Sequence, residues 1–216
     1  MLMLTTQNEV PKYDCQEILE IMIKEYSQIF TPNSNLWSFW GYDHPKYDSR
    51  NMEIVANKYA LSTNLDQLYK DIIIPVYDLD KKSPRLITRK DKFFLKEISK
   101  GIISAPSYFV LSPSIDLNGN EHHFIDGGVV ANCPAMLAVT HILEHSEGHV
   151  SASQFIIINI GTGKPKDNYP YTKIKDWGKL DWANNISTLL IDANSQILVQ
   201  RNGTRPILSI NGSESL

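Results

Sequence analysis

The spacing of apolar residues along the chain predicts helices in its first third. Apolar side chains recur at helical intervals over residues 14–30 and again over residues 51–60. The first of these helices is expected to end at Thr31-Pro32, because proline cannot continue a helix. A further short turn or helix is predicted over residues 64–70, after which the pattern changes.

From residue 72 onward, short β-branched apolar runs alternate with helical patterns. Strands are predicted at residues 72–77, 86–88, 122–125 and 155–160. Helices are predicted at residues 94–104, 131–145 and 181–200. The run at 72–77 is continuously apolar, as expected of a buried strand of the parallel type, and the run at 155–160 is the clearest predicted buried strand in the chain. This alternation predicts an α/β fold with a mainly parallel sheet, and residues 1–216 are interpreted as one domain because no linker interrupts them.

Composition and charge narrow the function. The 216 residues carry 21 Lys and Arg against 24 Asp and Glu, so the net charge of −3 gives no electrostatic footprint for nucleic acid. The 2 cysteines fit neither a disulfide framework nor a zinc site, which favours a reducing compartment such as the cytoplasm. No apolar stretch approaches the roughly 20 residues of a membrane-spanning helix.

The strongest chemical signal is an aspartate at a predicted strand end. Asp126 follows the strand at 122–125, and Gly127 and Gly128 lead from it into the helix at 131–145. Strand ends are where α/β proteins bind their ligands, and a carboxylate held there suits a general base. The two glycines let the backbone approach closely. We therefore predict Asp126 as a catalytic residue, presented by Gly127 and Gly128.

The spelling of this segment resembles a known motif. Residues 126–138 read D-G-G-V-x-A-N-x-P-x-x-x-A, which is similar to the acid-bearing motif of patatin-like phospholipases, a family of serine lipid acyl hydrolases. Residues 102–109 resemble the family's helix-ending segment, and residues 155–163 resemble its apolar strand followed by G-T-G. A W-G…W segment follows at Trp177, Gly178 and Trp182. The resemblance covers nearly all of the chain in the same order.

The resemblance implies a fold, an activity and a partner. It implies the three-layer patatin-like α/β fold and cleavage of fatty-acyl esters by a Ser–Asp dyad, with Asp126 as proton acceptor. The expected substrates are phospholipids or other acyl lipids, with peripheral membrane contact and without any metal or organic cofactor. Some members of the family are secreted effectors, which would place the protein outside the cytoplasm.

One part of the family pattern is missing from the sequence. No serine has a glycine two residues before it, so there is no G-x-S-x-G elbow, and no three glycines adjoin. Residues 1–9 resemble the family segment just after the elbow, which is the tail of the helix that the serine begins. We therefore expect an N-terminally truncated patatin-like domain that is inactive alone. The alternative is a catalytically dead remnant that binds lipid or protein.

A second chemistry competes with the first. His141, Glu144 and His145 spell H-x-x-E-H, the inverted zincin pattern, in which two histidines share one helix face. A zinc metallopeptidase also needs a downstream carboxylate, and the glutamates after His145 lie too close or in the C-terminal tail. Asp192 would be a substitute ligand outside that pattern. The competing interpretation is a solvated helix face.

Overall fold

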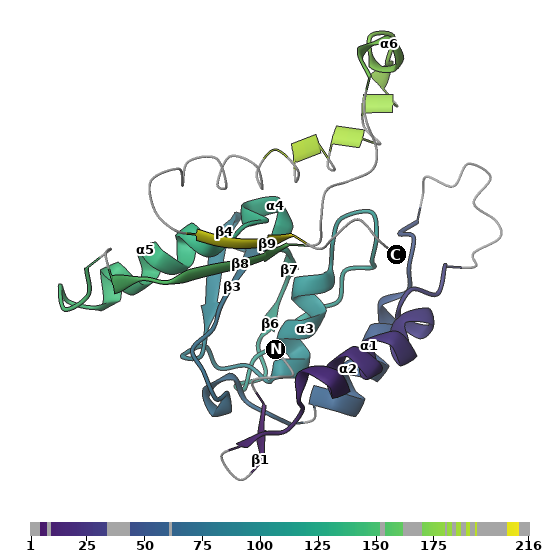
Figure 1. Ribbon diagram of the computed structural model, residues 1–216. Helices are drawn as coiled ribbons and strands as arrows, with labels where there is room; N and C mark the ends of the chain where they lie inside the picture. Colours follow the sequence, from purple (N-terminus) through teal and green to yellow (C-terminus); the bar gives the residue numbers. More distant parts are fainter. Residues whose placement is uncertain are drawn as a thin grey trace. The chain divides into compact units, whose positions relative to one another are not determined.

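The computed structural model of the chain describes most of its residues (Figure 1). They are residues 5–7, 10–33, 44–60, 62–151, 154–161, 170–179, several positions between 181 and 193, and 207–211. The chain separates into two compact units, Met1–Val130 and Ala131–Leu216.

The first unit is built on a three-stranded antiparallel sheet. Its strands are β3 (Ile73–Asp78), β4 (Ser83–Thr88) and β7 (Phe124–Asp126), in the order β4-β3-β7. The predicted strands are confirmed, but the parallel type predicted for the first of them is wrong. The physical reason is the connection: residues 79–82 return the chain directly as a hairpin, whereas a parallel pairing needs a long crossover.

Three helices and a short 3-10 turn accompany this sheet. They are α1 (Cys15–Ile29), α2 (Ser49–Ala60), η2 (Leu65–Gln67) and α3 (Leu95–Ile103), all at predicted positions. The start of α1 is fixed by a capping box in which Asp14 and Glu17 each accept a hydrogen bond from the other's backbone N–H. The helix contacts α2 through Glu25, which accepts hydrogen bonds from Lys58 and Tyr59.

A single apolar core joins α3 to the sheet. Its most deeply buried members come from β3, β4, β7, α3 and the segments beside them: Leu65, Leu68, Val76, Ile87, Phe93, Leu95, Ile98 and Phe124. Within it Phe93 and Phe124 meet edge to face, with ring centroids 5.9 Å apart. Phe124 belongs to the strand that ends at Asp126, so this core fixes the strand carrying the candidate acid.

A hairpin precedes β7. It pairs β5 (Ser114–Ile115) with β6 (Glu121–His122), and an equally short pair, β1 (Thr6–Gln7) and β2 (Val10–Pro11), lies near the start of the chain. The β5–β6 turn is organised by Asp116, which accepts hydrogen bonds from Asn120 and Asn118 and contacts His122. The pKa of Asp116 lies well below its ordinary value, mainly because its carboxylate accepts a hydrogen bond from the Asn120 side-chain amide.

The second unit departs further from the sequence predictions. The helix predicted over 131–145 is two helices, α4 (Gly128–Ala131), at the boundary of the units, and α5 (Ala135–His145). Pro134 separates them at the N-cap of α5, because proline lacks a backbone N–H and disfavours helix in the residue before it.

Parallel pairing does occur in the second unit. The strands β8 (Ile157–Gly161) and β9 (Ile207–Asn211) form a parallel pair, and α6 (Tyr171–Ile174) lies between them in sequence. The mainly parallel sheet is nevertheless not confirmed, since the other strand pairs in the described part of the chain are antiparallel. The predicted burial is also wrong: Ile156, Ile158 and Ile160 are 89%, 59% and 77% exposed. These alternate residues project to one face of the strand, and a single parallel partner strand covers an edge and not a face.

Two predictions lie largely outside the described residues. The helix expected at 181–200 is seen only at a few positions, which have helical backbone. The segment 162–169, which contains the rest of the G-T-G sequence, is also outside them. Of the helices in the described ranges, none combines the length and apolar character needed to cross a bilayer.

Candidate functional site

Asp126 ends the edge strand β7. In the antiparallel register it lies opposite Val76, and its backbone N–H donates a 3.2 Å hydrogen bond to the Ser104 carbonyl at the C-cap of α3. The side chain is half-buried. Its Oδ1 accepts a 2.8 Å hydrogen bond from the backbone N–H of Gly128. The carboxylate is therefore oriented by the turn that follows it and remains partly open to solvent.

Gly127 is required by a close approach of two backbones. A Cβ built at this position would lie 2.0 Å from the Pro75 carbonyl oxygen and 2.6 Å from its carbonyl carbon. The neighbour is backbone in the middle of β3, so it cannot move aside as a flexible side chain would. The turn that carries Asp126 can pack against β3 only if residue 127 has no side chain.

Inserting an extra methyl group into a well-packed site typically costs about 1–3 kcal/mol. We expect Gly127→Ala to destabilise the first unit by about 3 kcal/mol or more, because backbone has to shift. The free energy of unfolding from a urea titration measures this. Gly178→Ala is the matched control, since a Cβ there would lie 3.7 Å from the nearest side-chain atom. Equal stability of the two variants would contradict the close approach at Gly127.

A partly buried ion cluster on the β3–β4 hairpin supports β7. The sequence pattern did not predict this cluster. Arg85 on β4 donates a 2.7 Å hydrogen bond to Asp91, and its Nη1 lies 3.6 Å from Oδ2 of Asp78. The Asp78 side chain is only 1% exposed. The Arg85 guanidinium also lies over the Phe124 ring, 5.4 Å from its centroid. Arg85 is the one charged residue of β4, and no local pattern in the sequence identified Asp78 as its buried partner.

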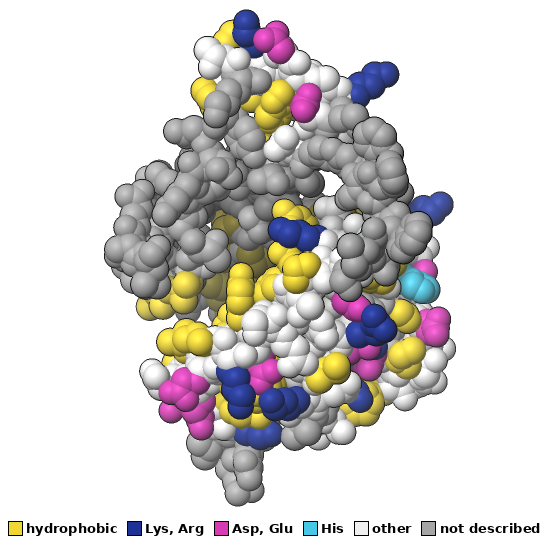
Figure 2. Space-filling view, turned by 90° about the vertical axis from the view of Figure 1, so that its right-hand side faces the viewer, with side chains coloured by type: hydrophobic (Ala, Val, Ile, Leu, Met, Phe, Trp, Pro, Cys, Tyr) yellow, Lys and Arg dark blue, Asp and Glu magenta, His cyan; other side chains and the backbone are white. Residues whose placement is uncertain are grey.

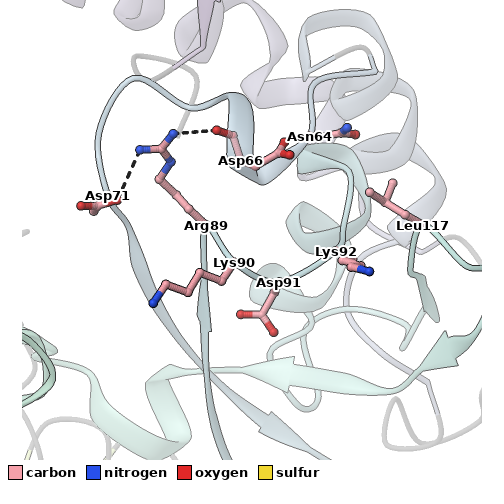
Figure 3. A pocket seen from close by; sticks show the side chains of 8 residues that line it. All are labelled: Asn64, Asp66, Asp71, Arg89, Lys90, Asp91, Lys92 and Leu117. Carbon is pink, nitrogen blue, oxygen red and sulfur yellow. Dashed lines mark hydrogen bonds and ion pairs between the residues drawn. The ribbon is translucent and has the colours of Figure 1, made fainter. Parts of the chain in front are cut away.

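A polar hollow of about 390 Å³ lies near the other end of the same hairpin (Figure 3). Its lining is Asn64, Asp66, Asp71, Arg89, Lys90, Asp91, Lys92 and Leu117. Arg89 bridges its wall by an ion pair to Asp71 and a hydrogen bond to the Asp66 carbonyl. The lining contains three acidic and three basic side chains and does not include Asp126. The hollow and the candidate acid are thus separate features of the first unit.

The competing metal site is only partly assembled. His141 and His145 do share one face of α5, as predicted, and their rings stack with centroids 4.0 Å apart. Within the described residues no three His, Cys, Asp or Glu side chains converge as a metal site would need. Asp192, the substitute third ligand, lies outside these residues. The structure therefore brings together two of the predicted ligands.

Together these features define a class of protein. The chain is a mixed α/β protein in which a carboxylate at a strand end is oriented by a glycine turn. Such a carboxylate can accept a proton from a hydroxyl placed within hydrogen-bond reach. Among the described residues, the hydrogen bond recorded to its side chain comes from Gly128 and not from a serine.

Comparison with known proteins identifies relatives of the chain. No family model matches it. It is 28% identical over 225 residues to Patatin-like protein 2 of Arabidopsis thaliana, which covers 90% of this chain and 55% of that protein. It is 27% identical to Patatin-like protein 4 of the same plant, covering 85% and 51%. With Patatin-like protein 2 of Oryza sativa subsp. indica the identity is 26%, covering 84% and 52%.

These matches establish a family relationship with the patatin-like proteins, as the motif resemblance predicted. The chain spans about half the length of the curated relatives it matches.

Proposed function

We propose that this chain carries the catalytic acid of a lipid acyl hydrolase, with Asp126 as the proton acceptor. The observation that carries the proposal is the Asp126 turn, in which Gly128 orients the carboxylate and Gly127 packs on Pro75. The family relationship supports the class of reaction. The 216 residues contain no G-x-S-x-G sequence, and the proposal therefore places the nucleophilic serine in polypeptide outside them.

In the proposed reaction, the serine oxygen attacks the acyl carbonyl of the lipid ester while its proton passes to the Asp126 carboxylate. The proton then goes to the departing alcohol as the ester C–O bond breaks, which leaves an acyl-serine. Water, deprotonated by the same carboxylate, releases the fatty acid and regenerates the serine. An ionised aspartate is a weak base toward a hydroxyl, so positioning and oxyanion stabilisation must supply most of the rate.

The test is hydrolysis by the longest natural product of the gene that encodes these residues. Release of fatty acid from phosphatidylcholine vesicles is measured for that product and for the 216-residue chain. We expect turnover by the longer product and none by the chain alone. Absence of turnover by both would favour the alternative, a catalytically dead member of the family that binds lipid or protein.

We also propose peripheral contact with the lipid surface, through α1. Four of its apolar side chains are between 52% and 70% exposed: Leu19, Met22, Ile23 and Tyr26. Their spacing puts them on one face of the helix, and Glu25, through which the helix contacts α2, lies outside this stripe. Figure 2 views the side of the molecule on which α1 lies in Figure 1, and hydrophobic side chains are visible at that surface.

Replacing Met22 and Ile23 together by serine is expected to weaken co-sedimentation with phosphatidylcholine vesicles about tenfold, because each loses exposed apolar area that would enter the interface. Leu117→Ser, which changes a 39% exposed residue between β5 and β6, serves as control. Unchanged vesicle binding by the double variant would remove α1 as the contact.

A further inference from the structure

The helix α5 carries two histidines that the proposed function does not use. His141 and His145 lie one turn apart, and their rings stack with centroids 4.0 Å apart and planes inclined by 29°. His141 is half-buried and His145 is exposed. Both rings can therefore be reached by an ion from solvent, and residues at positions i and i+4 present their side chains to the same point above the helix.

The tautomer of one ring is fixed by the backbone. Nδ1 of His145 lies 2.8 Å from the carbonyl oxygen of His141. A carbonyl oxygen only accepts hydrogen bonds, so Nδ1 of the neutral ring carries the proton and Nε2 keeps its lone pair. Histidines that bind metals are commonly held in this way, with the second ring nitrogen donating to a carbonyl or carboxylate. His145 is thus oriented as an Nε2 ligand before any ion arrives.

We propose that His141 and His145 form a two-ligand site for a transition-metal ion of the Zn²⁺ and Cu²⁺ class. Imidazole nitrogens suit these ions, whereas Mg²⁺ and Ca²⁺ require several oxygen ligands. No third protein ligand converges on the pair within the described residues, so water fills the remaining positions. The site is a chelate across one helical turn and differs from the three-ligand centre of a metallopeptidase.

The position of the pair gives the ion a physical effect. No residue of α5 is fully buried, so packing contributes little to the stability of this helix. Its C-terminal end is followed by Glu147, whose φ of 50° ends the helical conformation. A metal that joins residues 141 and 145 closes the last turn of α5. Binding therefore stabilises the helix as well as occupying its surface.

The test uses the full 216-residue chain after removal of metals with a chelator. Titration with Cu²⁺ and with Zn²⁺ at pH 7.5, followed by calorimetry, is expected to give one saturable site, with tighter binding of Cu²⁺. We expect His141→Ala and His145→Ala each to weaken binding at least about tenfold, because a chelate loses one of its two ligands. His149→Ala, in an exposed histidine beyond the end of α5, is the matched control and should bind as the unchanged chain does.

A spectroscopic readout separates this site from others. The electron paramagnetic resonance spectrum of the Cu²⁺ complex should contain couplings from two imidazole nitrogens, and His141→Gln, a polar replacement that retains helix propensity, should reduce them to one. The proposal would be overturned if a variant with both His141 and His145 replaced by alanine bound Cu²⁺ as tightly as the unchanged chain. It would also be overturned if the unchanged chain showed no saturable binding.

Discussion

Replacing Asp126 by asparagine is expected to slow lipid hydrolysis by about 10²–10⁴-fold in the longest natural product of the gene, the range typical of general acid–base catalysis. An amide at this position cannot accept the proton of the serine hydroxyl. Its oxygen can still accept the hydrogen bond that Gly128 donates to Oδ1, so the turn should keep its shape. The measurement is kcat/KM for a phospholipid, together with the circular dichroism spectrum.

Asp80→Asn is the control for this variant. Asp80 is exposed and lies beyond the end of β3, and the hydrogen bonds recorded to its carboxylate come from His123 and not from the Asp126 turn. The control should retain the activity of the unchanged protein. If Asp126→Asn retained most of its activity while the fold persisted, the role given to Asp126 would be wrong even for an active lipase.

Replacing Phe124 by alanine is expected to lower the free energy of unfolding by about 3–5 kcal/mol. Its side chain is fully buried and meets the Phe93 ring, the Arg85 guanidinium and the stacked ring of His122. Alanine would leave a cavity among these partners and would also remove the aromatic face beneath a partly buried cation. Urea unfolding followed by tryptophan fluorescence measures the change.

Tyr69→Ala is the matched aromatic control, because Tyr69 is 48% exposed. Its loss should cost less than about 1 kcal/mol, as is usual for surface positions. A similar small cost for Phe124→Ala would contradict its place in the core. Since Phe124 and Asp126 share β7, the variant is also expected to loosen the candidate acid, which would appear as a lower kcat.

The sequence by itself located the main helices and the three sheet strands of the first unit, and it indicated Asp126 as a candidate acid. The periodicity of apolar residues located α1, α2 and α3, because an apolar stripe at helical spacing and a capping residue both lie within one short segment of sequence. The place of Asp126 at the end of a strand, before Gly127 and Gly128, was also predicted, because the three residues are consecutive in the sequence. The family relationship followed from the same segment and from the order of its neighbours.

Only the tertiary structure decided how the strands pair and why residue 127 has to be glycine. Ile73–Asp78 is apolar enough for a parallel strand, yet its partners are antiparallel, because pairing depends on the connection between strands and not on their composition. Likewise, the packing of Gly127 on Pro75, where an added Cβ would lie 2.0 Å from the carbonyl oxygen, joins segments about 50 residues apart. No local pattern encodes such a contact. The buried partner of Arg85, Asp78, became visible for the same reason: side-chain geometry is fixed by packing, whereas the sequence specifies only which side chains are available.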